Sequence, residues 1–141
     1  MPPKSNVSSS IIALDVGERR IGVARASLIA RLPEPLTTLE RGESSLQDIK
    51  RLVDEQAAEA VVVGLPRGLQ GQDTQQTMTT QAFIAMLIAT LAVPVHTQDE
   101  AVTSVKAEAE LVGRKVPYNK GDVDALAATY ILEDYLSTHH S

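Results

Sequence analysis

Several carboxylates fall where a strand ends or a helix begins, which is where α/β proteins place their chemistry. They are Asp15, Asp99, Glu100, Asp122 and Asp124. Burying a carboxylate is costly unless another group pairs with it. Clusters of oxygen ligands suit Mg²⁺ or Mn²⁺, and two such ions about 4 Å apart can activate a water and stabilise the leaving oxygen in phosphodiester hydrolysis. The combination therefore indicates metal-dependent hydrolysis of phosphodiesters.

Four of the five carboxylates also have a purely structural interpretation, whereas Asp124 lies one turn further into its helix and has less need to exist as a cap. Asp15 can accept backbone N–H bonds in the turn that leads to Gly17. Asp99 or Glu100 can cap the helix that follows, and Asp122 is placed as an N-cap. The functional interpretation rests on the combination of acidic positions in this order, and not on any one of them.

The elements that would position these carboxylates follow from apolar patterning. Residues 11–15 are a continuous apolar run that ends on Asp15, as expected for a strand buried on both faces. The expected strands are 11–15, 20–27, 36–40, 60–64 and 93–97. The expected helices begin at Ser44 or Ser45, at Thr74, at Ala101 and at Gly121, with the last two covering 101–112 and 121–137.

This order predicts an α/β fold with a mixed five-stranded sheet. The first three strands form an antiparallel meander, and a helix–strand–helix–strand–helix–helix series follows, with helices on both faces. The strand at 93–97 should be parallel to the strand at 11–15. The acidic positions would then meet at one edge of the sheet.

Length and composition limit the classes of protein. The 141 residues fit one domain, which we place at 11–137 between disordered tails at 1–10 and 138–141. The absence of cysteine excludes disulfides, cysteine-based zinc sites and a thiol nucleophile. The N-terminus lacks the apolar core of a signal peptide, and the longest apolar stretch is too short to span a bilayer comfortably. We expect a cytoplasmic protein that does not associate with membranes.

The charge balance disfavours a protein whose main task is to coat nucleic acid. Thirteen basic and 18 acidic residues give a net charge of −5, whereas such proteins are usually basic. The four aromatic residues also disfavour a base-stacking platform. An enzyme with a local basic patch remains compatible with both observations.

Four segments together resemble the YqgF/RuvX family of RNase H-like nucleases, a Holliday-junction-resolvase-like group. "ALDVGERRIGVA" resembles the opening D-x-G…R-x-G-x-A motif, and "VVVGLPRGLQGQDT" resembles a V-x-G-x-P…G block. "PVHTQDEAVTS" resembles the strand that leads into a D-E-R-x-T-T signature, and "KGDVDALAATYILEDYL" resembles the closing D-x-x-A-A-x-x-I-L helix. The resemblance covers residues 11–136.

The resemblance implies an RNase H-like fold and a carboxylate site. By motif, Asp15, Glu100 and Asp124 take the catalytic, metal-binding positions, with Asp99 as the alternate ligand, and two Mg²⁺ or Mn²⁺ ions are expected. The implied substrate is RNA, at the 5′ end of precursor 16S ribosomal RNA. One departure is Ala101, where the family usually has an arginine that would grip a phosphate bidentately.

Basic residues near the expected strand ends are candidates for nucleic-acid binding. Arg19, Arg20 or Arg114 could replace the missing arginine. Arg67 lies in a glycine-rich loop that lacks the ending of a P-loop, and a basic loop surrounds Tyr118. Both loops can equally be solvated surface. The candidates for nucleic-acid binding are Arg20, Arg67, Arg114, Lys115 and Lys120.

Three other functions compete with the RNA nuclease. A DNA junction resolvase has the same fold, and its symmetric substrate calls for a dimer, whereas we expect a monomer or a weak homodimer. A non-catalytic, nucleic-acid-binding ribosome-assembly factor would explain Ala101 and the acidic balance. An ATP-handling domain of the actin or sugar-kinase kind also uses D-x-G turns, but it needs two domains, and this chain is too short.

Overall fold

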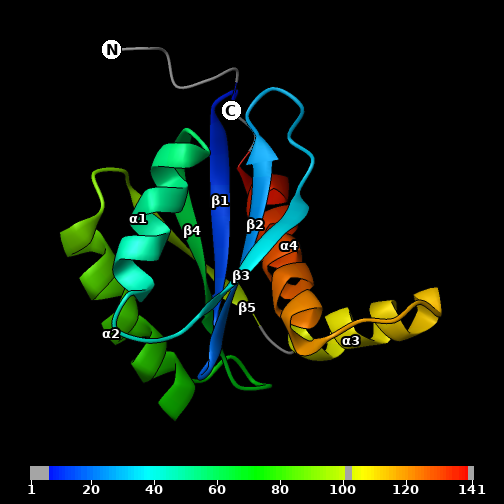
Figure 1. Cartoon of the computed structure of the whole chain (residues 1–141). Helices are drawn as coiled ribbons and strands as arrows, with labels where there is room; N and C mark the ends of the chain where they lie inside the picture. The colour runs from blue at the N-terminus through cyan, green and yellow to red at the C-terminus, as the bar shows by residue number, and fades with distance from the viewer. Residues whose placement is uncertain (1–6, 101–102, 140–141) are drawn as a thin grey trace.

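The computed structural model describes residues 7–100 and 103–139 and shows a mixed five-stranded sheet with helices on both faces (Figure 1). The strands are β1 (Ser10–Val16), β2 (Arg20–Ser27), β3 (Glu34–Glu40), β4 (Ala58–Pro66) and β5 (Val95–Glu100). The helices are α1 (Ser45–Glu55), α2 (Gln75–Thr90), α3 (Thr103–Arg114) and α4 (Lys120–Thr138). The predicted fold class is confirmed.

The strand order β3-β2-β1-β4-β5 places β1 at the centre of the sheet. β2 is antiparallel to both β1 and β3, whereas β4 is parallel to β1 and β5 is parallel to β4. The C-terminal ends of β1, β4 and β5 therefore share one edge, as the crossover rule predicts. The acidic residues at the ends of β1 and β5 lie along this edge.

Alternate residues of β1 supply two separate apolar cores, because successive side chains of a strand point to opposite faces. Ile12 and Leu14 pack with α1 and α2 on one face. Ile11 and Ala13 pack on the other face with α4, whose Ile131 and Leu132 are buried there. The core between α4 and the sheet contains several alanines, and these small side chains let the helix lie close to the strands.

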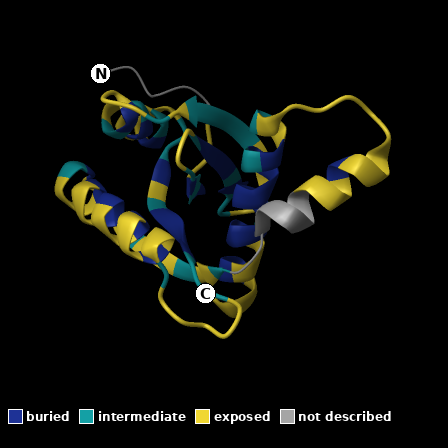
Figure 2. Ribbon diagram, turned by 90° about the horizontal axis from the view of Figure 1, so that it is seen from below, coloured by how far each residue is buried: buried dark blue, intermediate teal, exposed yellow. Residues whose placement is uncertain are grey.

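The helix α3 packs on α4 rather than on the sheet and projects from the body of the molecule (Figure 2). Its Leu111 joins Val123, Leu126 and Tyr130 of α4 in a small third core. Most of the described surface of α3 is exposed. In the part of the chain that the structure describes, no helix has the length and apolar character needed to cross a membrane.

Four strands have boundaries that differ from the prediction, and β4 extends two residues beyond the expected 60–64 at each end. β5 begins two residues later than expected and includes Gln98, Asp99 and Glu100, because these polar residues pair with Gly64–Pro66 at the end of β4. β3 begins at Glu34 and includes Pro35, which an edge strand tolerates. Ser10, which we assigned to the N-terminal tail, belongs to β1 and is fully buried.

The terminal tails are described only in part. Residues 1–6 and 140–141 lie outside the described residues, and Thr138 is the last residue of α4. One domain between two tails remains a prediction. Ala101, at the position of the family's arginine, also lies outside the described residues.

Candidate active site at the C-terminal ends of β1 and β5

Asp15 lies at the end of β1 on the face that α4 covers. Ile11 and Ala13 pack against α4, and every second side chain of a strand points to the same face. Asp15 therefore faces α4 as well. The following turn is closed by a hydrogen bond of 2.9 Å from the Gly17 N–H to the Arg20 carbonyl. The buried strand therefore ends on a carboxylate that lies beneath α4.

The register of β5 separates Asp99 from Glu100. Asp99 pairs with Leu65, which belongs to the core under α1 and α2, whereas Glu100 pairs with Pro66. His96, four residues before Glu100, stacks on Tyr135 of α4, with ring centroids 5.8 Å apart. Glu100 thus shares the face of Asp15, and Asp99 lies on the opposite face. Sequence alone left this choice open.

Gly22 brings Asp124 to Asp15. Asp15 and Gly22 are register partners across β1 and β2. A Cβ at position 22 would lie 1.9 Å from the Asp124 carbonyl oxygen and 2.9 Å from the Ala125 nitrogen, so only glycine permits this approach of α4 to the sheet. The first turn of α4 therefore begins beside the end of β1.

Charge at this edge is only partly compensated. Burial, and to a lesser extent the nearby negative charge of Asp124, raise the pKa of Asp15 from 3.8 to about 6. Arg20 donates from Nε to Asp124 Oδ2 at 2.6 Å. Glu100 is half-buried, and its Oε1 is shielded from solvent. Arg20 thus compensates Asp124, while Asp15 stays next to the negative charge of Asp124.

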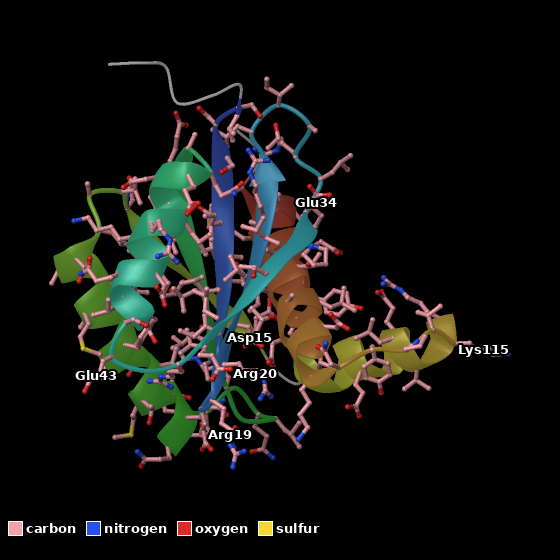
Figure 3. All side chains as sticks on the ribbon, viewed as in Figure 1. Asp15, Arg19, Arg20, Glu34, Glu43 and Lys115 are labelled. Carbon is pink, nitrogen blue, oxygen red and sulfur yellow. The ribbon has the colours of Figure 1, made fainter. Side chains whose placement is uncertain are left out.

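The carboxylates do not form a ready-made metal shell. In residues 7–100 and 103–139, no three His, Asp or Glu side chains lie close enough to hold one ion together. Figure 3 shows Arg20 next to Asp15 at the lower end of the sheet. The oxygen-only donor set has the chemistry that Mg²⁺ and Mn²⁺ require, and the buried charge at Asp15 is what a dication would neutralise.

Asp122 has a structural role. The Asn119 side chain accepts a hydrogen bond of 2.9 Å from the Asp122 N–H, and the Asp122 carboxylate accepts one of 2.9 Å from the Asn119 N–H. This reciprocal capping box begins α4 and directs the helix onto the sheet. The N-cap is therefore Asn119 rather than Asp122, and Asp124 follows with its carboxylate available to Arg20.

The predicted basic residues do not gather in one patch. Arg67 forms ion pairs with Asp73 and with Asp99, the latter at 3.2 Å. Arg114 pairs with Glu110 on its own helix, and Lys115 lies just beyond the far end of α3, away from Asp15 (Figure 3). Lys120 is the first residue of α4. Arg20 forms an ion pair with Asp124, and Arg67 forms one with Asp99, the alternate ligand.

Sequence reasoning missed two residues near this site. Gly22 has a signal in the sequence, because a glycine inside a strand often marks a close approach of backbones. Arg41 has none, since its surroundings are assembled from three distant segments. Its guanidinium donates to the Gly17 carbonyl at 2.9 Å and lies 5.2 Å from the centre of the Phe83 ring.

The comparison with protein families decides the membership. The family model described as "RuvX: Holliday junction resolvase" matches residues 9–138. The chain belongs to the RuvX family. This RuvX chain is 44% identical over 135 residues to the "Putative pre-16S rRNA nuclease" of Chloroflexus aurantiacus, covering 93% of the chain and 88% of that relative. A protein of the same name from Crocosphaera subtropica is 40% identical over 131 residues, covering 90% and 92%.

Solved structures agree on the fold of this RuvX chain. T. thermophilus RuvC in complex with a Holliday junction superimposes with a TM-score of 0.55 at 13% identity, covering 93% of this chain and 96% of RuvC. The fowlpox virus resolvase gives a TM-score of 0.53 at 12% identity, covering 94% and 99%. At such low identity these structures show the fold alone, which is RNase H-like. Family membership makes the RuvX chain a nuclease, a hydrolase of phosphodiester bonds.

Proposed function

We propose that this chain is a metal-dependent endonuclease that processes the 5′ end of precursor 16S ribosomal RNA, with Asp15, Glu100 and Asp124 as its catalytic, metal-binding residues. The observation that supports this site is that Asp15 and Glu100 lie at the C-terminal ends of β1 and β5 on the face that α4 covers, with the Asp124 backbone of α4 beside Gly22. The names of the relatives support the substrate. A role in ribosome biogenesis in the cytoplasm follows from that substrate.

The carboxylates would hold one or two Mg²⁺ or Mn²⁺ ions. When bound, these ions would supply an activated water and stabilise the leaving oxygen of the phosphodiester. Asp15 has to be deprotonated to act as a ligand, and its pKa of about 6 allows this at neutral pH. Asp99 is left out of the ligand set because it lies on the other face and pairs with Arg67.

Arg20 has a second task in this proposal. Its guanidinium compensates Asp124 before metal binds, at a distance of 2.6 Å. Because Arg20 engages Oδ2 of Asp124, a metal that took this oxygen would release the guanidinium. Arg20 is then available to a phosphate oxygen of the substrate, which a planar guanidinium binds well. This would replace the arginine that the chain lacks at position 101.

Three observations favour alternative functions, which the experiment has to distinguish from the RNA nuclease. The description of the family model favours branched DNA as the alternative substrate. Arg20 already pairs with Asp124, and no three described carboxylate or histidine side chains form a metal cluster. Both of these observations favour a non-catalytic ribosome-assembly factor. A resolvase would be a dimer, whereas we propose a monomer or a weak homodimer.

The test is a cleavage assay with Mn²⁺ on a precursor 16S RNA end and a four-way DNA junction in parallel. We expect cleavage of the RNA that EDTA abolishes and that Asp15→Asn reduces by at least about 10³-fold. Cleavage of the junction alone would establish the resolvase instead. Folded protein that cuts neither substrate but binds the RNA would favour the assembly factor.

A further inference from the structure

Arg41 is held in place by three contacts around the end of β1. Its backbone N–H donates to the Arg19 carbonyl at 2.9 Å, and its guanidinium donates to the Gly17 carbonyl at 2.9 Å. The guanidinium carbon also lies 5.2 Å from the centre of the Phe83 ring of α2. These contacts fix a half-buried cation next to the turn that follows Asp15.

The charge of Arg41 has no partner among the described carboxylates. Arg20, Arg67 and Arg114 all form ion pairs, but no described Asp or Glu forms one with Arg41. The contact with the Gly17 carbonyl uses one N–H donor of the guanidinium, and the contact with Phe83 uses its flat face. The other N–H donors of the guanidinium remain available. An anion from outside the chain can take them without breaking a contact.

Arg41 lines a cavity of about 400 Å³, which is within the range of small-ligand sites. Gly17, Glu18 and Arg41 form one wall of this cavity, and Gln75, Gln76 and Thr79 of α2 form the other. The amide and hydroxyl side chains of α2 are exposed, and they offer donors and acceptors of the kind that sugars and base edges use. Glu18 is the one described acidic residue of this lining.

The cavity and the carboxylates lie on opposite sides of the same strand end. Asp15 is on the α4 face, and the cavity is on the face of α1 and α2. Gly17 lies between them and has no side chain to obstruct a polymer at the edge of the sheet. Arg19 is exposed on the same turn and forms no ion pair with a described carboxylate.

We propose that Arg41 and its cavity bind a backbone phosphate and the attached nucleotide of the substrate strand, next to the phosphodiester that is cleaved. The guanidinium takes the phosphate oxygens, and the polar side chains of α2 contact the nucleotide. This subsite rests on the proposed function for the position of the cleaved bond. It fixes the path of the strand across the edge of the sheet at Gly17.

The test measures binding of a fluorescein-labelled single-stranded RNA to the whole chain by anisotropy in EDTA, where cleavage does not contribute. Arg41→Ala is expected to weaken binding about tenfold at low salt. It should also reduce the slope of log Kd against log salt by about 0.7, which is the effect of one lost phosphate contact on a single strand. Arg51→Ala is the matched control, because Arg51 is exposed on α1 and pairs with Asp48 and Glu55.

Two further variants separate binding from folding, because Arg41→Ala also removes the contacts to Gly17 and Phe83. Gln76→Glu adds a negative charge to the opposite wall and should weaken binding several-fold, whereas Glu18→Gln should strengthen it. The subsite would be overturned if Arg41→Ala lost affinity without a change in the salt slope while Gln76→Glu bound RNA normally. Equal effects of Arg41→Ala and Arg51→Ala would also overturn it.

The result is separable from the proposed nuclease activity. Binding that depends on Arg41 in a protein that cuts nothing would support the subsite and contradict the enzyme. Cleavage that depends on Asp15, with RNA binding that ignores Arg41, would contradict the subsite and leave the enzyme supported.

Discussion

Asp15 lies at the end of a buried strand, and its pKa is about 6. Burial and the negative charge of Asp124 raise this pKa from the ordinary value of 3.8. A raised pKa means that the folded protein binds a proton more tightly than the unfolded chain. Between pH 4 and 6 the folded state therefore holds more protons, and the free energy of unfolding falls as the pH rises. Above pH 6 the cost of the ionised carboxylate is fully present.

Asp15→Asn should therefore stabilise the metal-free protein at pH 7–8, by on the order of 2–3 kcal/mol. The gain should shrink through pH 6 and vanish near pH 4, where Asp15 is protonated in both states. Urea unfolding in EDTA at several pH values measures this. Asp54→Asn, which removes an exposed carboxylate of α1, should change stability by less than about 0.5 kcal/mol throughout. A gain from Asp15→Asn that does not vary with pH would contradict the argument.

The identity of the site residues could be predicted from sequence, but their partners could not. The motifs single out Asp15 and Asp124, yet only the fold shows that Arg20 pairs with Asp124. Arg67 was expected to contact nucleic acid, and its ion pairs with Asp73 and Asp99 depend on a loop that returns to the end of β5. Ion pairing between distant segments leaves no local pattern in the sequence.

At the scale of elements, the contact between β2 and α4 positions the site. Gly22→Ala would place a methyl group 1.9 Å from the Asp124 carbonyl oxygen and 2.2 Å from its carbon. Both are backbone atoms, so α4 would have to move away from the sheet and take Asp124 with it. We expect a loss of about 3 kcal/mol or more in the free energy of unfolding, measured in urea.

Gly42→Ala is the matched control for this variant, because a Cβ at Gly42 meets nothing within 4 Å. It should change stability by less than about 1 kcal/mol. If Gly22→Ala were as mild as Gly42→Ala, α4 would not be held against β2 at Asp124, and the geometry of the site would need another explanation.

The elements themselves were predictable where apolar patterning decides them. β1 and α4 carry strong patterns and appear within one or two residues of the expected ranges. β5 was misplaced because Gln98, Asp99 and Glu100 have low strand propensity, and their pairing with β4 overrides it. The faces of Asp99 and Glu100 depend on this register, since a shift of one residue exchanges the two faces.

At the scale of the whole molecule, binding of a dication to three carboxylates from β1, β5 and α4 should stabilise the fold. At a Mn²⁺ concentration of 100 times the Kd, the gain is about 2.7 kcal/mol, which corresponds to a rise in Tm of roughly 5–10 °C for a chain of this size. The rise should be smaller at pH 5 than at pH 8, because Asp15 has to lose its proton before it can bind the ion.

Neighbouring residues of β5 provide the sharpest control for this metal site. Glu100→Gln should remove most of the Mn²⁺-dependent rise in Tm, because Glu100 shares the face of Asp15. Asp99→Asn is an equivalent change one residue away on the opposite face, and it should leave the rise unchanged. The reverse result would make Asp99 the ligand and would require a different register of β5. An equal rise in both variants would show that the ion binds without β5, since neither carboxylate would then contribute to its site.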